Sequence, residues 1–283
     1  MKESLYLKVN TMNYEMLELW YSPLKMVALS EDKPIFTPHD FIHYVAKANN
    51  ISVDAIKVPK RLVFTYQRRT YEHAKNVIGG KPVECWIYGE SQPFCVGQLN
   101  RVNVGLGLFW IGAPAVVMTL EEVIACGARK IIEVGVSGGL QSFLKPGDII
   151  VVTEAIRDEG TSYHYFPPEV KVESSKRLRG NLIKRLSECN VAHYVGSVWS
   201  TDGVYRETLG KFRRFKERGV LAVNMETSAV FALAKYRNVE AASLQVISDI
   251  LSETGWLQAF EQQTVREKSK KAVEVALEVL SKT

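Results

Sequence analysis

Short runs that are apolar on both faces alternate with segments of helical periodicity along most of this chain. Residues Lys130–Val136 (KIIEVGV) are apolar on both faces apart from Glu133, and they follow a helical segment, Pro114–Cys126, that Gly127 ends. A strand without a polar face has to be covered on both sides, as strands of parallel sheets are. The alternation therefore predicts an α/β fold, a single domain with a mixed, mainly parallel twisted sheet flanked by helices.

The other predicted elements follow the same alternation. Strands are expected at Arg61–Tyr66, Val83–Tyr88, Phe94–Val96, Arg101–Leu108, Asp148–Thr153, Ala192–Ser197, Val220–Asn224 and Ala241–Ile247, and helices at Thr70–Val77, Met225–Tyr236 and Glu267–Leu280. A further helix is expected at His39–Asn49, with Thr37 as its cap and Pro38 at its first position. We interpret residues 1–60 as an N-terminal extension that packs on a core domain, residues 61–283.

The composition excludes several classes of protein. The 36 basic and 31 acidic residues leave a net charge of +5, which is too small for a nucleic-acid footprint but suits an anionic small molecule. The apolar runs are short and broken by Gly and Pro, and the N-terminus lacks the apolar core of a signal peptide, so no membrane association is expected. The four cysteines have no metal-ligand spacing: Cys85, Cys95, Cys126 and Cys189. We expect a cytoplasmic protein with reduced thiols, without a metal and without a cofactor.

Four segments place glycine or polar residues near the end of a predicted strand, where open α/β sheets bind ligands. They are Gly135–Gly139 (GVSGG), Gly105–Pro114 (GLGLFWIGAP), Asn224–Glu226 and Ser248–Asp249. The two glycine-rich segments let a ligand approach backbone N–H groups, although tight turns and helix starts have the same composition. Each segment taken alone therefore has a structural interpretation as well as a functional one.

The two acidic residues likewise have two interpretations each. Glu226 lies where a helix opens, and a carboxylate there commonly only complements the helix dipole. Alternatively, it accepts hydrogen bonds from a vicinal diol such as that of ribose, with Met225 packed against the sugar. Asp249 follows a strand, where it either caps the next turn or protonates a leaving group as a general acid.

Taken together, these segments resemble the nucleoside phosphorylase and nucleosidase family. The strongest likeness lies in Glu133–Asp148 (EVGVSGGLQSFLKPGD), Asn224–Ala234 (NMETSAVFALA) and Ala242–Asp249 (ASLQVISD). Arg157–Pro168 and Trp199–Thr208 are similar to a subgroup usually labelled nucleoside or uridine phosphorylase. The resemblance runs from about Arg61 to the C-terminus and leaves the first sixty residues outside it.

The resemblance implies roles for particular residues. Glu226 is expected to bind the ribose 2′ and 3′ hydroxyls above Met225, and Asp249 to act as the acid near the purine N7. Ser137 and Gly138 are expected to contact the substrate. In the base pocket, Val204 stands where this family usually has a stacking phenylalanine, so stacking is left to Tyr205, Trp199 or another residue. His164 is a further candidate for the base or the 5′ hydroxyl, although a surface or core histidine is more typical of such a position.

The phosphate site departs from the family pattern. Glu133 stands where phosphorylases usually have an arginine and Val136 where they have Ser or Thr, and a carboxylate beside phosphate repels it. Arg69 aligns with the arginine of the family's phosphate loop, and Arg68 or Arg69 is expected to bind phosphate together with Ser137. A solvated start of a helix explains this arginine pair equally well.

Two reactions are compatible with these residues, and we favour the first. In phosphorolysis, inorganic phosphate is the co-substrate, and a purine or broad-range nucleoside yields free base and ribose 1-phosphate. In hydrolysis, Glu133 helps to activate water. Uridine phosphorolysis is an alternative, and a non-catalytic nucleoside-binding relative is a third hypothesis. The family also implies a homo-oligomer, either a dimer or a trimer of dimers, with nucleoside and phosphate as the small-molecule partners.

Overall fold

The computed structural model describes residues 33–83 and 86–283. The strands are β1 (Arg61–Thr65), β2 (Lys81–Pro82), β3 (Phe94–Leu99), β4 (Val102–Leu108), β5 (Lys130–Gly139), β6 (Ile149–Asp158), β7 (Val172–Glu173), β8 (His193–Thr201), β9 (Ala222–Asn224), β10 (Glu240–Ser252) and β11 (Gly255–Gln258). The helices are α4 (Pro38–Ala48), α5 (Arg68–Ile78), α6 (Ala113–Ala125), α7 (Lys176–Glu188), α8 (Leu209–Glu217), α9 (Thr227–Tyr236) and α10 (Gln263–Ser281). The predicted α/β fold class is therefore confirmed.

The strands form one mixed sheet whose longest pairings are parallel. β4, β1, β5 and β10 lie side by side in parallel, whereas β6 pairs antiparallel with β10. β6 then pairs with β8, β8 with β9, and β9 returns to β5. This part of the sheet therefore closes on itself, a feature that the sequence pattern did not predict.

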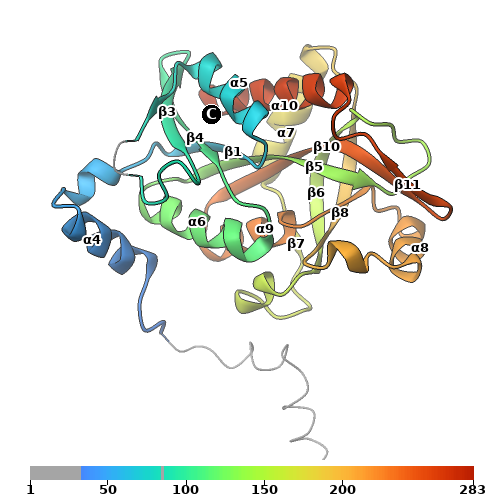
Figure 1. Cartoon of the computed structure of the whole chain (residues 1–283), viewed down its shortest axis with the longest axis horizontal. Coiled ribbons are helices and arrows are strands. Elements are labelled where there is room, and N and C mark those ends of the chain that lie inside the picture. The colour runs from blue at the N-terminus through green and yellow to red at the C-terminus, as the bar shows by residue number, and fades with distance from the viewer. Residues whose placement is uncertain (1–32, 84–85) are drawn as a thin grey trace, which may run out of the picture.

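Helices cover both faces of the sheet, as the doubly apolar strands require. Figure 1 shows α5, α7 and α10 on one side of the sheet and α6 and α9 on the other. On the first side, Leu178, Leu182 and Leu186 of α7 pack into the same apolar cluster as Val63 of β1. On the second side, α6 and α9 bury their apolar residues with Leu62 and Phe64 of β1. The two faces of one strand thus supply two separate cores.

Most predicted elements are present, but one predicted strand is wrong. In the described residues of Val83–Tyr88 no strand is present, since Val83 and Trp86 lie outside any helix or strand and Ile87 and Tyr88 form a turn. The only strand nearby in the described residues is the short β2, which pairs with β3. The helices α7 and α8 were not predicted, although Leu178, Leu182 and Leu186 have helical spacing.

The described part of the N-terminal segment packs on the domain. α4 begins with the predicted cap, since Thr37 Oγ1 accepts from Asp40 N–H and the Asp40 carboxylate accepts from Thr37 N–H. Ile42, Val45 and Ala46 of α4 are buried in the cluster that contains α6. Residues 1–32 lie outside the described residues, so the boundary at residue 60 stays a prediction.

Two further sequence expectations concern the thiols and membrane association. Cys95 and Cys126 are buried free thiols and Cys189 is partly buried, while Cys85 lies outside the described residues. Among the residues that the structure describes, no helix combines the length and the apolar character that crossing a bilayer needs.

Candidate active site

A cavity of about 710 Å³ lies where β1, β5 and β10 end near the start of α9. It brings together seven of the residues that the sequence indicated for the site: Ser137, Gly138, Val204, Tyr205, Met225, Glu226 and Asp249. These residues come from positions as far apart as 137 and 249, so the fold itself assembles the site. Arg68 and Arg69 are not among its lining residues.

Two of the segments expected to follow strands lie within them instead. The GVSGG segment continues β5 as far as Gly139, and β10 runs past Ile247 to Ser252. The register of these two strands shifts between Ile247 and Asp249, where Asp249 comes opposite Gly138. A Cβ added to Gly138 would lie 2.9 Å from Asp249 Oδ2 and 2.5 Å from Leu251 Cδ1. Glycine at 138 therefore makes room for the acid rather than forming a turn.

Glu226 is the N-cap residue of α9 rather than part of its first turn. Its Oε1 accepts a 2.8 Å hydrogen bond from Gly112 N–H, and its Oε2 accepts one of 3.1 Å from Met225 N–H. Gly112 caps the N-terminus of α6 with a φ of +102°, a conformation that favours glycine. The expected anion site at the end of the GLGLFWIGAP segment is thus occupied by the carboxylate of this protein's own Glu226.

Burial changes the proton affinity of Glu226. Loss of water around the carboxylate, followed by the nearby charge of Glu133, raises the pKa of Glu226 to about 7. Each of its oxygens keeps a lone pair beyond the backbone bond it accepts. The ionised carboxylate can therefore accept two hydrogen bonds from adjacent hydroxyl groups.

Asp249 is held by two donors in the same cavity. Ser248 Oγ donates to its Oδ1 (2.7 Å), and Trp256 Nε1 donates to its Oδ2 (2.7 Å). Trp256 lies on β11, the strand that pairs antiparallel with β10. These bonds fix the carboxyl group at the edge of the cavity, where only 7% of the residue is exposed.

Glu133 lies behind the cavity wall rather than in the cavity. Its side chain is fully buried, and its oxygens accept hydrogen bonds from Tyr66 Oη (2.6 Å) and Thr227 Oγ1 (2.7 Å). Burial raises the pKa of Glu133 in spite of these donors. Glu133 is not among the residues that line the cavity, whereas its hydrogen-bond partner Tyr66 is, and the activation of water by Glu133 stays a prediction.

The base side of the cavity differs from the expectation in its aromatic residues. Trp199 is fully buried against Phe215 and donates to Asp158, so it is excluded as a stacking residue. Tyr205 lines the cavity but is almost fully exposed. Trp256 and Phe260, which the sequence reasoning missed, also line it. His164 is an exposed residue outside the cavity, in agreement with its structural interpretation.

Besides Glu226 and Asp249, the cavity contains the acidic residue Glu207, which the sequence reasoning also missed. Glu207 is half-buried in the wall, and burial together with the charge of Asp249 raises its pKa to about 7. Lys211, which lowers that pKa, is itself paired with Asp158 at 2.7 Å. The position of Glu207, directly after the short turn Val204–Arg206, was the available sequence signal.

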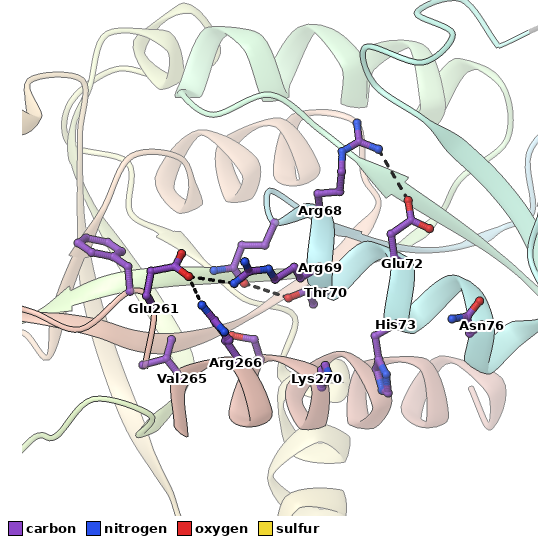
Figure 2. Close-up of a pocket in the computed structure, with 13 residues that line it drawn as sticks. Arg68, Arg69, Thr70, Glu72, His73, Asn76, Glu261, Val265, Arg266 and Lys270 are labelled. Carbon is purple, nitrogen blue, oxygen red and sulfur yellow. Dashed lines mark hydrogen bonds and ion pairs between the residues drawn. The ribbon is translucent and has the colours of Figure 1, made fainter. Parts of the chain in front are cut away.

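The two predicted phosphate-binding arginines lie in a different, neighbouring cavity of about 690 Å³. Figure 2 shows Arg69 directed toward Glu261, which also pairs with Arg266, while Arg68 is directed toward Glu72. Phe260 lines both cavities. Within this structure, Arg68 and Arg69 therefore make no contact in the cavity of Glu226 and Asp249, and their binding of phosphate stays a prediction.

Comparison with known proteins agrees with this architecture. Residues 69–281 match the family model described as "Phosphorylase superfamily". Uridine phosphorylase of Treponema pallidum is 30% identical over 195 residues, 65% of this chain and 74% of that protein. Purine nucleoside phosphorylase DeoD-type of Bacillus cytotoxicus is 30% identical over 185 residues, 63% of this chain and 75% of that protein. The fold of Toxoplasma gondii purine nucleoside phosphorylase, solved with immucillin-H, matches with a TM-score of 0.74 at 17% identity, over 81% of this chain and 92% of that chain.

These matches show that the chain is an enzyme that transfers pentosyl groups. More specifically, the chain belongs to the phosphorylase superfamily, and its relatives are nucleoside phosphorylases.

Proposed function

We propose that this protein is a cytoplasmic nucleoside phosphorylase, which converts a purine or broad-range nucleoside and inorganic phosphate into free base and ribose 1-phosphate. The observation that carries the proposal is one cavity holding a buried diol acceptor, Glu226, and a fixed carboxyl group, Asp249. These two groups suit the two halves of a nucleoside, its sugar and its base.

In this proposal the ribose lies against Glu226 and Met225. The ionised carboxylate accepts from the 2′ and 3′ hydroxyls, which orients the sugar and stabilises the positive charge that develops at its anomeric carbon. A phosphate oxygen forms a bond to that carbon as the bond to the base nitrogen breaks, and the electron pair of the broken bond stays on the base. Ser137 and Gly138 line the same cavity beside this reaction centre.

The departing base needs a proton, and the cavity contains a source for it. Glu207 and Asp249 face the same space, and the charge of Asp249 contributes to the raised pKa of Glu207, about 7. At that pKa the carboxyl group of Glu207 is protonated in about half of the molecules at neutral pH. Proton delivery to the purine N7 is work that suits this pair, whereas a uracil base has no N7 to receive it.

Uridine remains the alternative substrate class, because relatives of both kinds match the chain equally well. Uridine phosphorylase of Treponema pallidum and the purine enzyme of Bacillus cytotoxicus are both 30% identical to it. Glu207 and Asp249 favour a base that offers hydrogen-bond donors and a basic ring nitrogen. For this reason we propose purine nucleosides as the preferred substrate class.

Product analysis tests the proposal. The purified protein is incubated with inosine, adenosine, guanosine, methylthioadenosine and uridine, each with and without phosphate, and free base and sugar are separated by chromatography. We expect purine release that requires phosphate and yields ribose 1-phosphate. Equal release without phosphate, with free ribose as product, would establish a nucleosidase instead, and turnover of uridine alone would move the protein to the pyrimidine class.

We further propose that the protein works as a homo-oligomer, either a dimer or a trimer of dimers. Large apolar side chains are exposed next to the cavity, among them Ile111 (65%) and Trp256 (55%), and burial by a neighbouring subunit would cover them. Light scattering of the full chain measures the assembly directly, and a monomer at working concentration would contradict this part of the proposal.

A further inference from the structure

The hydrogen-bonding state of Tyr66 follows from the residues behind it. Thr227 Oγ1 accepts from Asn224 Nδ2 (2.6 Å) and from Gln245 Nε2 (3.3 Å), which uses both of its lone pairs. Its own proton therefore goes to Glu133 Oε2. The other oxygen of the same carboxylate, Oε1, receives the proton of Tyr66 Oη at 2.6 Å. Burial and the adjacent charges of Glu133 and Glu226 raise the pKa of Tyr66, which keeps the phenol neutral.

A tyrosine hydroxyl has one proton and two lone pairs, so this one faces the cavity as an acceptor only. The hydroxyl group of Ser137 likewise has only lone pairs left for a ligand, because its proton is donated to Gln245 Oε1 at 2.7 Å. Tyr66 follows β1 and Ser137 lies on β5, and these strands are parallel neighbours with Thr65 opposite Val134. One end of the cavity thus presents lone pairs from two neighbouring strands.

An oxyanion without a proton is repelled by such a surface, whereas one that keeps an O–H group can donate to it. At neutral pH, phosphate and arsenate carry at least one proton and sulfate carries none. We propose that Tyr66, held by Glu133, binds the protonated oxygen of the attacking phosphate and selects a protonated oxyanion over sulfate. Tyr66 is then a substrate-binding residue, and Glu133 is the residue that positions its proton. This inference rests on the proposed phosphorolysis.

Glu133, at the position where the family usually has a phosphate-binding arginine, then has the role of orienting Tyr66. The carboxylate does not meet the phosphate, since it is fully buried behind Tyr66. It acts instead by fixing the direction of the tyrosine hydroxyl. A carboxylate at position 133 is therefore compatible with an anionic co-substrate that carries a proton.

The test measures anion selectivity with the nucleoside that the product analysis identifies. Initial rates give KM for phosphate and for arsenate, and the inhibition constant of sulfate against phosphate. In the unmodified enzyme we expect arsenate to replace phosphate and sulfate to inhibit only weakly. Tyr66→Phe removes a hydrogen bond to a charged ligand, so KM for phosphate should rise on the order of tenfold, while sulfate inhibition stays the same or strengthens.

Two further variants keep the test decisive. Glu133→Gln, like Tyr66→Phe, should lower the ratio of the sulfate inhibition constant to KM for phosphate, although it leaves Tyr66 in place. Tyr88→Phe is the matched control, because Tyr88 donates to the buried Glu122 at 2.8 Å in the same manner but outside the cavity. Thermal unfolding of each variant separates a loss of folding from a loss of selectivity.

Strong inhibition of the unmodified enzyme by sulfate would overturn this inference while leaving phosphorolysis intact. An unchanged selectivity ratio in folded Tyr66→Phe and Glu133→Gln would overturn it equally. Base release that does not depend on phosphate, seen before any anion is compared, is the separate failure of the proposed function.

Discussion

The indole Nε1 of Trp256 donates a 2.7 Å hydrogen bond to Oδ2 of Asp249, which links the exposed hairpin strand β11 to the acid of the cavity. Trp256 is 55% exposed, whereas Asp249 is 7% exposed. The partly exposed side chain of Trp256 thus orients the nearly buried carboxyl group of Asp249. The geometry of the acid therefore depends on the position of β11.

Loss of this bond should impair catalysis without affecting phosphate binding. Trp256→Phe keeps an aromatic ring but removes a donor to a carboxylate, a contribution of about 1.5–3 kcal/mol. We expect kcat/KM for the nucleoside to fall by roughly 10- to 100-fold with KM for phosphate unchanged. Leu257→Ala on the same strand is the control, since Leu257 is similarly exposed (56%) and does not line the cavity. Equal losses in both variants would instead indicate a general disturbance of the hairpin.

Glu207 should determine which bases are accepted. Glu207→Gln removes a carboxyl group that can hold a proton near neutral pH, so purine nucleoside turnover should fall on the order of tenfold or more, within the usual range for proton transfer. Turnover of uridine, which has no N7 to protonate, should fall less. Glu253→Gln is the matched control, because Glu253 lines the same cavity but is bound to Arg213 at 3.0 Å. A uniform decrease for both base classes would argue against a role of Glu207 in selectivity.

The buried carboxyl groups should make stability fall as pH rises toward neutrality. The pKa of Glu226 is raised from 4.5 to about 7, so between these values the folded protein binds more protons than the unfolded chain. Stability from this group is present below pH 4.5 and is lost as pH approaches 7. The difference in unfolding free energy between Glu226→Gln and the unmodified protein should therefore shift in favour of the variant by on the order of 3 kcal/mol from pH 5 to pH 8. Urea unfolding at both pH values measures the difference, and an effect independent of pH would contradict it.

Arg69 and Arg68 offer a direct test of the predicted phosphate site. Arg69 pairs with Glu261 in the cavity that shares Phe260 with the cavity of Glu226 and Asp249, whereas Arg68 pairs with Glu72 on its own helix. If Arg69 binds phosphate during turnover, Arg69→Ala should raise KM for phosphate on the order of tenfold and Arg68→Ala should leave it nearly unchanged. Unchanged phosphate kinetics in both variants would assign this arginine pair to the solvated start of α5.

The local pattern of apolar residues was sufficient to predict the fold class and most elements. Thr37 and Pro38 predicted the start of α4, and the doubly apolar run at Lys130–Val136 predicted a strand covered on both faces. Glu226 and Asp249 became candidates because each lies near the end of a predicted strand, and the resemblance to the nucleoside phosphorylase and nucleosidase family placed them in one site. Such features depend on neighbours in the sequence and on the periodicity of helices and strands.

Contacts between distant segments decided the rest. β5 and β10 continue through their glycine and polar residues because each supplies the other with backbone partners, and the sheet closes through β9 in the same way. The direction of the Glu133 carboxylate, away from the cavity and under Tyr66, depends on Thr227, which lies 94 positions further along the chain. Separation of Arg69 from the cavity likewise depends on Phe260 and Glu261. The sequence by itself thus determined the fold class, most of the elements and two of the acidic residues of the cavity, Glu226 and Asp249. Only the tertiary structure decided what each charged group faces, because burial and hydrogen-bond partners are set by residues remote in the chain.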